Sequence, residues 1–427
     1  MKYKNYHSLV FLTLLFSVSV FSQTTLNYTI GKWFDNKKAA SSFTFDDALS
    51  GQFTDAMPIL EANNIKGTFF IITNNVPTQL GGWKLVQQAI TNGHEIGNHT
   101  VSHPTLGDLT EDEIDGQLKN ANDLIMTNTQ SKPVTMAYPN GSGGGDTPAD
   151  QKVRSVVKQY FIGARAVGGL FNEYNFADNE ENYFKVKSPM IFEATTADEV
   201  GKSLESTIAG GGWYCPTYHG VVNGWIIVPK QLFEAHVKEY AKRSKDLWMT
   251  TFSKIVKYHR ERKTARLIQI SEDSKSWVLS LTDTLSNNSL WNQELTLNLE
   301  RPSWTIFSIS QNGKVIPYII VGNQVIFSAI PDGGNIVFGK VNTAANNIIE
   351  QDKSWKISQN PVGNTINILN LKEGKDYHIN ITTISGSVYK TLNLTAKNNQ
   401  ILMPCNDFMK GLYLVNIDGL SQKLILN

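Results

Sequence analysis

The sequence predicts an α/β domain, barrel-like or open, followed by two small all-β blocks. From residue 39 to about residue 265, short apolar runs alternate with longer amphipathic ones, which is the pattern of strands alternating with helices. After residue 266 the apolar residues alternate with period two between turn signals, as in β-strands. The chain has 427 residues, and 41% of them are hydrophobic, so it can bury more than one core.

The charges of the chain nearly balance. Lys and Arg number 39 and Asp and Glu number 38, so the net charge is +1. This balance predicts no nucleic acid or other polyanionic partner. The hydrophobic content excludes a disordered chain, and the low cysteine content excludes a disulfide scaffold. Cys215 and Cys405 lie far apart in the sequence, and we expect both to be free.

Residues 1–22 are predicted to be a secretory signal peptide. Lys2 and Lys4 precede an apolar run over residues 9–21, and Ser22 follows it. A membrane anchor is the alternative, but the run is shorter than the roughly 20 residues that a spanning helix needs. We therefore expect cleavage after Ser22 and no transmembrane segment in the mature chain.

Residues 23–265 are expected to form the α/β domain. Capping signals mark three helix starts. They are the capping box of Thr110 and Glu113, which opens a helix toward Met126, the pair Thr147-Pro148, and Pro229. Strands are expected at residues 41–45, 67–73, 95–99, 134–138, 161–166, 213–219 and 247–252. Active sites of such folds lie at the carboxyl ends of the strands, so we expect the chemistry there.

Two all-β blocks follow. Residues 266–341 are expected to form a β-sandwich that buttresses the first domain, with strands at 267–270, 277–281, 295–299, 304–309, 316–321 and 325–330. A polar, Asn-rich linker covers residues 342–357. The last block, residues 358–427, has strands expected at 366–369, 377–382, 388–394 and 412–417.

The first chemical cluster is Thr44-Phe45-Asp46-Asp47, where an apolar strand runs into two carboxylates. Neighbouring strand residues point to opposite faces, so both carboxylates reach one pocket only if the chain leaves the strand here. Two close carboxylates without a cation would repel and raise one pKa. A metal ligand beside a free base removes this conflict, whereas the alternative is an Asp pair at a turn or helix cap.

The second cluster contains His94, His99 and His103. The spacing of four between His99 and His103 suits one metal ion, because a helical turn or tight loop places both imidazoles on one side. Imidazole is a common zinc ligand in sites that keep positions open for water. We expect His94 to be a hydrogen-bonded structural histidine, with a supporting role behind the ligands as the alternative.

These segments resemble the motifs of a known family. Thr44-Phe45-Asp46-Asp47 and His99-Thr100-Val101-Ser102-His103-Pro104 are similar to the first two motifs of the polysaccharide deacetylases, carbohydrate esterase family 4 with its NodB-homology domain. Ala137-Tyr138-Pro139-Asn140-Gly141 resembles the third motif, Tyr218-His219-Gly220 the histidine motif, and residues 247–252 the closing strand. The resemblance covers about residues 38–262 and implies a distorted (β/α) barrel and a metal-dependent deacetylase.

The resemblance implies a role for each matching residue. Asp47, His99 and His103 would bind one divalent metal ion, Zn²⁺ with Co²⁺ or Ni²⁺ as alternatives. Asp46 would be the general base and His219 the general acid. Such an ion lowers the pKa of a bound water and polarises an acetyl carbonyl, so the implied roles are chemically consistent.

The third motif is implied to hold the substrate or the oxyanion through Tyr138, Asn140 and Gly141. The donor would be the backbone N–H of Asn140, and Gly141 would let the backbone approach the substrate closely. Without the resemblance, these residues are equally typical of a plain turn.

The sequence departs from the family pattern in two places. Position 137 is Ala where the third motif usually begins with an Arg that pairs with the base. We expect Arg165, at the end of the next strand, to take that place, with an ordinary surface Arg as the alternative. The fourth motif, an Asp with a Trp, is not clearly present, and Asp178 and Asp198 are both candidates for its Asp.

The last block resembles a second family. Gln359-Asn360-Pro361-Val362, Gly386 and Gly411-Leu412-Tyr413-Leu414-Val415, with a strand at the very end, are similar to the C-terminal sorting domain of the type IX secretion system. With the signal peptide, the resemblance implies export to the outside or the cell surface of a Bacteroidetes-like bacterium by that machinery. A carbohydrate-binding or spacer module is the alternative.

The expected function is removal of acetyl groups from a glycan by a secreted hydrolase. The family acts on N-acetylglucosamine polymers such as chitin or peptidoglycan, or on O-acetylated xylan, so both amide and ester bonds stay open. A non-catalytic carbohydrate-binding relative is the alternative, although it would lose ligands or the base. An iron oxygenase would need a β-rich ligand scaffold, and a glycosidase would need two carboxyls about 5 Å or more apart.

Overall fold

The computed structural model describes residues 26–340, 355–358, 365–383, 388–406, 408, 411–417 and 420–426. The predicted signal peptide, residues 1–22, lies outside the described residues, as does most of the predicted linker. The end of that linker is part of a strand, β19 (Lys356–Ile357). No helix among the described residues is long and apolar enough to cross a membrane.

A curled parallel sheet forms the first domain, as predicted. Its strands lie in the order β7 (Gly163–Arg165), β6 (Thr135–Ala137), β5 (Glu95–Asn98), β4 (Gly67–Ile71), β3 (Phe43–Asp46) and β9 (Thr217–Tyr218), and every pair is parallel. A second parallel sheet has the order β10 (Leu247–Met249), β2 (Ala39–Ser41) and β8 (Trp213–Tyr214). The single strands predicted at 41–45 and 213–219 are therefore each divided between two sheets. In the latter, Pro216 lies at the break, where it has no N–H to donate to a ladder.

One irregular segment closes the gap between the edge strands β7 and β9. Val186 pairs in parallel with Arg165 of β7, and Met190 pairs in parallel with Thr217 of β9. Between them, Ser188 donates from Oγ to the carbonyl oxygen of Cys215 at 2.6 Å. This closing segment, residues 186–190, makes the sheet a distorted barrel.

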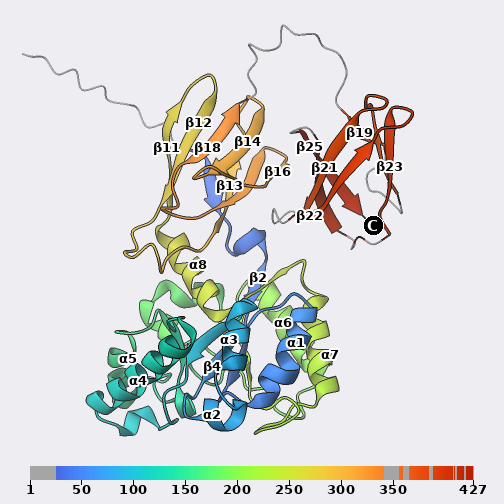
Figure 1. Ribbon diagram of the computed structural model, residues 1–427. Helices are drawn as coiled ribbons and strands as arrows, with labels where there is room; N and C mark the ends of the chain where they lie inside the picture. The colour runs from blue at the N-terminus through green and yellow to red at the C-terminus, as the bar shows by residue number, and fades with distance from the viewer. Residues whose placement is uncertain are drawn as a thin grey trace, which may run out of the picture.

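Helices surround this barrel (Figure 1). They are α1 (Met57–Ala62), α2 (Asn75–Leu80), α3 (Lys84–Thr91), α4 (Glu111–Thr129), α5 (Pro148–Val157), α6 (Ala197–Gly210), α7 (Lys230–Ala241) and α8 (Phe252–Thr264). The predicted capping box is confirmed, because Thr110 caps α4 with Glu113, and the predicted N-cap Thr147 in addition forms a capping box with Asp150 of α5. Helix α7 begins directly after Pro229, also as predicted.

Apolar side chains cover both faces of the parallel strands. Phe69 and Phe70 are neighbours in β4, yet they belong to two different buried clusters. Phe69 stacks on Phe45 with ring centroids 4.9 Å apart, whereas Phe70 packs edge-on against Phe252 of α8 at 5.7 Å. Burial on both faces is typical of parallel sheets and explains why these strands are continuous apolar runs.

The second domain is an antiparallel β-sandwich. One sheet has the order β1 (Tyr28–Ile30), β13 (Leu295–Glu300), β17 (Gln324–Ala329) and β16 (Tyr318–Val321). The other has the order β11 (Arg266–Glu272), β12 (Ser276–Thr282), β18 (Ile336–Lys340), β14 (Ile306–Gln311) and β15 (Lys314–Val315). The six predicted strands are present, and β1, β15 and β18 are additional.

Strand β1 corrects the predicted domain boundary. Residues 23–265 were expected to form one domain, but Tyr28–Ile30 pairs with β13 of the sandwich. In Figure 1 this blue N-terminal strand lies among the yellow and orange strands. A strand of three residues carries too short an alternation to be assigned from its sequence.

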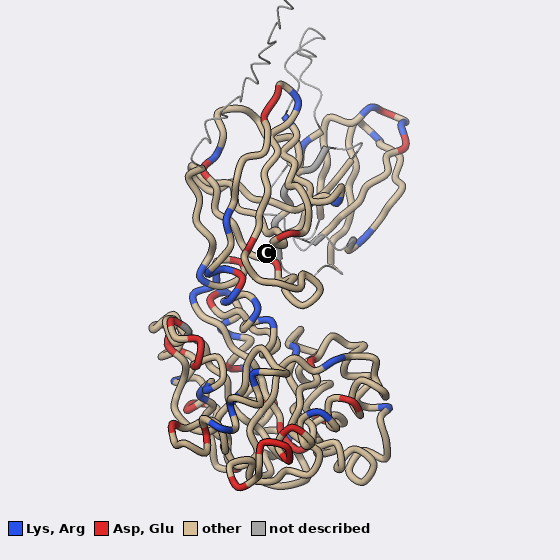
Figure 2. The backbone as a smooth tube through the Cα atoms, turned by 90° about the vertical axis from the view of Figure 1, so that its left-hand side faces the viewer, with Lys and Arg blue, Asp and Glu red and all other residues tan. Residues whose placement is uncertain are grey.

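Helix α8 joins the barrel to the sandwich. Tyr258 donates from its hydroxyl to the carbonyl oxygen of Gly31 at 2.9 Å, and the carboxylate of Glu261 accepts from the backbone N–H of Gln293 at 3.0 and 3.1 Å. Figure 2 shows basic residues gathered along this helix, whereas the two charge signs are mixed over the barrel. Glu261 is fully buried there, and burial raises its pKa to about 8.

The third domain also contains two antiparallel sheets. Strand β19 pairs with β20 (Thr365–Leu369), which pairs with β23 (Gln400–Pro404). The other sheet has the order β22 (Val388–Thr395), β21 (Asp376–Thr383), β24 (Gly411–Ile417) and β25 (Leu420–Leu426). Cys215 in the barrel and Cys405 here are both buried, and neither forms a disulfide among the described residues.

Candidate metal centre and active site

The aspartate pair lies where the chain leaves strand β3. Asp46 is the last residue of the strand, and Asp47 has a φ of 79°. Asp tolerates this left-handed region better than most residues. The turn sends both carboxylates to the same side, since an oxygen of each lies about 4 Å from Nε2 of His219: 4.0 Å for Asp46 and 3.9 Å for Asp47.

His99 follows strand β5 and is held with a defined tautomer. Its Nδ1 lies 2.8 Å from the carbonyl oxygen of Ala137, which can only accept, so Nδ1 carries the proton. In the neutral imidazole, Nε2 is then the atom with a lone pair for a metal, and it lies 3.5 Å from Oδ1 of Asp47. A backbone carbonyl behind a ligating imidazole is a common way of fixing its orientation.

His103 reaches the same point from a tight loop. Thr100 and His103 both have positive φ angles, 70° and 62°, and the backbone N–H of His103 donates to Oγ1 of Thr100 at 2.9 Å. Nε2 of His103 lies 3.8 Å from Oδ1 of Asp47. Burial and the neighbouring His99 lower the pKa of His103, which favours the neutral imidazole that a metal requires.

Asp47, His99 and His103 fit a divalent metal ion. One ligand atom from each lies within 4.8 Å of the others. Bonds of about 2.0–2.2 Å to zinc would place tetrahedral ligand atoms roughly 3.4 Å apart, close to the 3.5 and 3.8 Å found here. Two nitrogens and one carboxylate oxygen also leave positions open for further ligands.

Asp46 is paired with Arg165. Arg165 is fully buried, and its Nη2 donates to Oδ2 of Asp46, which is only 3% exposed. Burial by itself would raise the pKa of Asp46, but Arg165, followed by His99 and His219, outweighs it and lowers this pKa. Oδ1 of Asp46 is buried and has no hydrogen-bond partner among the described residues, so it is free to accept a proton.

Arg165 is itself held by the segment that closes the barrel. Its Nη1 donates to the carbonyl oxygen of Ala166 at 3.1 Å, to Oγ of Ser188 at 3.3 Å and to Oγ1 of Thr217. Ser188 and Thr217 are 2.5 Å apart through their hydroxyl oxygens. The guanidinium therefore lies at the junction of β7, β9 and the closing segment, facing Asp46.

His219 lies directly after strand β9. Its Nδ1 is buried without a hydrogen-bond partner in the part of the chain that the structure describes. Trp225 packs edge-on against the imidazole with ring centroids 4.7 Å apart, although this Trp is 59% exposed. Burial lowers the pKa of His219, against the raising effects of Asp46 and Asp47.

The third motif forms a tight turn beside the site. Asn140 and Gly141 have φ angles of 54° and 70°, and the N–H of Gly141 donates to the carbonyl oxygen of Tyr138 at 3.1 Å. The N–H of Asn140 is therefore the remaining candidate donor of this turn. Tyr138 is buried, and its hydroxyl donates to the carbonyl oxygen of Phe184 at 3.0 Å, so its side chain supports the barrel and does not face a substrate.

The other candidates lie away from the site. His94 accepts at Nδ1 from the N–H of Gly67 at 2.9 Å and is the structural histidine that we expected. Asp198 is exposed on α6 and pairs with Lys202 at 2.7 Å. Asp178 ends a 3₁₀ turn and acts electrostatically on His259. Neither aspartate is among the ion-pair partners of His219 in the described chain.

Two residues around the site were missed from the sequence. Trp225 follows His219 by six positions, and Gln52 follows Asp46 by six. Neither belongs to a spacing pattern that indicates a contact. The one available signal for Trp225 is a large aromatic residue after Gly224, in a segment with three glycine or asparagine turn residues, namely Gly220, Asn223 and Gly224.

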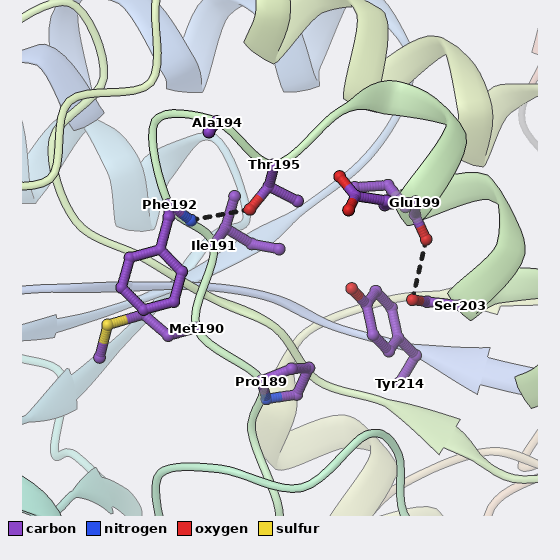
Figure 3. Close-up of a pocket in the computed structure, with 10 residues that line it drawn as sticks. Pro189, Met190, Ile191, Phe192, Ala194, Thr195, Glu199, Ser203 and Tyr214 are labelled. Atoms are coloured by element: carbon purple, nitrogen blue, oxygen red, sulfur yellow. Dashed lines mark hydrogen bonds between the residues drawn. The ribbon is translucent and has the colours of Figure 1, made fainter.

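A cavity of about 330 Å³ lies beside the closing segment (Figure 3). Its wall is formed by Pro189, Met190, Ile191, Phe192, Ala194, Thr195, Glu199, Val200, Ser203 and Tyr214. The N–H of Phe192 donates to Oγ1 of Thr195 at 3.0 Å, and Oγ of Ser203 donates to the carbonyl oxygen of Glu199 at 2.9 Å. These internal bonds brace the loop, and none of the candidate metal ligands lines the cavity.

Comparison with known proteins identifies two parts of the chain. Residues 35–162 match the polysaccharide deacetylase family, and residues 357–427 match the secretion system C-terminal sorting domain. The chain thus carries a polysaccharide deacetylase domain and, at its C-terminus, a sorting domain. Arg165 and His219 lie outside the first matched segment.

Several curated proteins are similar to this chain. Peptidoglycan-N-acetylglucosamine deacetylase PgdA of Listeria monocytogenes is 32% identical over 108 residues, 25% of this chain and 22% of that protein. Chitin deacetylase 1 of Cryptococcus neoformans is 31% identical over 116 residues, 27% of this chain and 23% of that protein. A gellan lyase of a Bacillus species is 25% identical over 338 residues, 72% of this chain but 13% of its own. The chain therefore spans less than a third of the length of these relatives.

Among solved structures, the peptidoglycan deacetylase PdaC of Bacillus subtilis is similar with a TM-score of 0.36 and 19% identity, covering 53% of this chain and 95% of that one. A carbohydrate esterase family 4 pseudoenzyme of Bacillus anthracis has a TM-score of 0.36 and 18% identity, with 52% and 66% covered.

Proposed function

We propose that the polysaccharide deacetylase domain of this chain is a metal-dependent hydrolase that removes acetyl groups from a glycan. One observation carries the proposal. Three metal-ligating side chains, Asp47, His99 and His103, converge on one point, and a second carboxylate and a third imidazole, those of Asp46 and His219, lie within 4.0 Å of that group.

Asp47, His99 and His103 would hold one divalent ion, with zinc as the first choice and cobalt or nickel as alternatives. Such an ion, when bound, supplies polarisation of an acetyl carbonyl and activation of water. The protein contributes two unprotonated Nε2 atoms and one carboxylate oxygen. The hydrogen bond from His99 to Ala137 keeps one imidazole oriented for this purpose.

Asp46 would act as the general base. Its Oδ1 has no partner among the described residues and can accept a proton from an attacking water. Its Oδ2 is occupied by Arg165, whose positive charge keeps the carboxylate ionised at neutral pH. Arg165 would thus do for Asp46 what the absent Arg at position 137 does in the family.

His219 would act as the general acid. Its Nε2 lies 4.0 Å from Oδ2 of Asp46 and 3.9 Å from Oδ2 of Asp47, so a proton at Nε2 would be given to the departing amine or alcohol beside the aspartate pair. The backbone N–H of Asn140 would stabilise the negative charge that develops on the acetyl oxygen, with Gly141 leaving room for the substrate.

The substrate would be an acetylated glycan. The similar proteins are named for action on peptidoglycan and chitin, and an acetylxylan ester is the further candidate. The test is acetate release from chitin oligomers, peptidoglycan and acetylxylan by the metal-loaded chain. No release from any of them, together with measurable binding to one, would support the alternative of a non-catalytic carbohydrate binder.

We further propose that the chain is exported in two steps and trimmed at both ends. The sorting domain supports secretion or display at the cell surface, and type IX secretion machinery would be its partner. Cleavage after Ser22 would give a form that starts near Gln23, and loss of the sorting domain would remove residues after about 357. Mass spectrometry of culture-supernatant protein tests both ends, and a full-length chain kept in the cytoplasm would contradict the proposal.

A further inference from the structure

The side chain of Gln52 joins the backbones of Asp46 and His219. Gln52 is the first residue of a π-helical turn, Gln52–Ala56, that precedes α1. Its Nε2 donates to the carbonyl oxygen of Asp46 and, at 2.9 Å, to the carbonyl oxygen of His219. The side chain is fully buried, so water does not compete for these two bonds. Single π-helical turns occur frequently at functional sites.

The two carbonyls lie just where the barrel ladder ends. Strands β3 and β9 pair in parallel, with Thr44 opposite Thr217 and Phe45 opposite Tyr218. The next position along this register places Asp46 beside His219, but β9 ends before it. Gln52 lies on a third segment, and its two hydrogen bonds therefore join the two strands beyond the end of their ladder. They do so at Asp46 and His219, the candidate base and acid.

The orientation of the Gln52 amide is set by its partners. Both are carbonyl oxygens, which only accept, so the NH₂ group must face them. Oε1 then points away and is buried without a hydrogen-bond partner among the described residues. Leaving a buried carbonyl oxygen unpaired is unfavourable for folding, and an apolar side chain would avoid it. The two hydrogen bonds that Gln52 donates offset this cost.

The backbone at Asp46 needs such support. Asp47 and Ala48 follow with φ angles of 79° and 59°, which non-glycine residues rarely adopt. Backbone of this kind persists where surrounding contacts hold it in place. On the other strand, Gly220 follows His219, and its N–H donates to the carbonyl oxygen of Trp225 at 2.7 Å.

We propose that Gln52 is a positioning residue that sets the separation between Asp46 and His219. The inference rests on the proposed function, since it concerns how the base and acid of that reaction are aligned. Oδ2 of Asp46 and Nε2 of His219 are 4.0 Å apart. Gln52 acts through the two backbones and touches neither the metal ligands' side chains nor the substrate.

Gln52→Met tests the proposal, because Met has a similar length and no donor. We expect kcat for acetate release to fall by about 10- to 100-fold, as misplacement of catalytic groups by about 1 Å can cost 10²-fold. KM and metal content per chain should stay at the wild-type values, since Asp47, His99 and His103 are untouched. An unchanged kcat overturns the proposal.

Gln311→Met is the matched control. Gln311 is a buried glutamine of the sandwich whose Nε2 donates to the carbonyl oxygens of Ile330 at 2.7 Å and Gly334 at 3.3 Å. The same substitution there removes the same kind of bonds far from the barrel, so melting temperature should fall while kcat stays unchanged. If Gln311→Met lowers kcat as much as Gln52→Met, the effect is general destabilisation and the proposal is wrong.

Two further readouts separate positioning from a merely structural role. The double variant Gln52→Met, Asp46→Asn should be no slower than Asp46→Asn alone, because groups that act as a unit are non-additive; full additivity overturns the proposal. A crystal structure of Gln52→Met should show Asp46 and His219 moved apart by about 1 Å. This last readout needs no turnover, so an inactive wild-type chain refutes the proposed function, and unmoved side chains refute the role of Gln52.

Discussion

The pairing of Arg165 with Asp46 makes the sharpest prediction about activity. Arg165→Met removes the guanidinium but keeps an apolar chain of similar length in a fully buried position. Asp46 is 3% exposed, so water cannot replace the lost cation. The buried carboxylate is then left with His99 and His219 as its remaining favourable neighbours.

The size of the effect follows from the burial of the pair. Removing one partner of a buried ion pair costs about 3–5 kcal/mol, because the other charge is left uncompensated. The pKa of Asp46 should therefore rise in the variant, because the strongest interaction that holds it down is lost. His99 and His219 still lower this pKa and limit the rise.

The assay is the pH dependence of kcat/KM for acetate release. A general base works when ionised, so activity falls as the pH drops through the pKa of Asp46. In Arg165→Met this acidic limb should move to higher pH, with activity falling about tenfold per pH unit below it. An unchanged acidic limb with full activity would refute the pairing argument.

Arg260→Met is the control for that variant. Arg260 is a mostly buried arginine of α8 that pairs with Glu180 at 2.9 Å and lies over the ring of Tyr183. The substitution removes an arginine ion pair outside the candidate site, one in which the carboxylate of Glu180 is exposed. A loss of melting temperature without a change of the pH profile is expected there.

Three further predictions concern single side chains. His103→Ala should lose metal and activity together. An undiminished metal content by elemental analysis would refute the proposed metal site. Asp46→Asn and His219→Ala should each keep the metal but lose about 10²- to 10⁴-fold in turnover, and wild-type rates would refute the base and acid roles. Burial raises the pKa of Glu261 from its ordinary 4.5 to about 8, so the folded state favours the protonated acid and stability should fall as pH rises between those values. Glu261→Gln, which can still accept from Gln293, should lack this slope in thermal unfolding followed against pH, and an unchanged slope would contradict the assignment.

Local patterns were enough for most of the elements. The helix caps at Thr110 and Thr147 involve residues three positions apart, so such caps can be recognised in the sequence, and both are found in the structure. The sandwich strands alternate over five to seven residues, and that period is also local. Strands β1 and β15 were not predicted, because two or three residues are too few to show an alternation of apolar and polar side chains.

The metal site was predictable for the same reason. His99 and His103 are four positions apart after strand β5, and Asp47 follows β3 of the same parallel sheet, where the carboxyl ends of the strands meet at one edge. Their convergence needed only the assumption of that sheet. The loop that turns His103 toward Asp47 depends on positive φ angles at Thr100 and His103. Such angles cannot be predicted from the sequence at residues other than glycine.

By itself, the sequence determined the kinds of chemistry present and the order of strands and helices, because hydrophobic period, capping and short motifs all act between near neighbours in the chain. The tertiary structure decided what supports that chemistry. Arg165 meets Asp46 across 119 positions, and Gln52 reaches His219 across 167. The first contact depends on the curvature of the barrel and on residues 186–190 closing it, and the second on the pairing of β3 with β9. Such contacts leave no local periodicity, since their energy comes from burial and charge between segments that only the completed fold brings together.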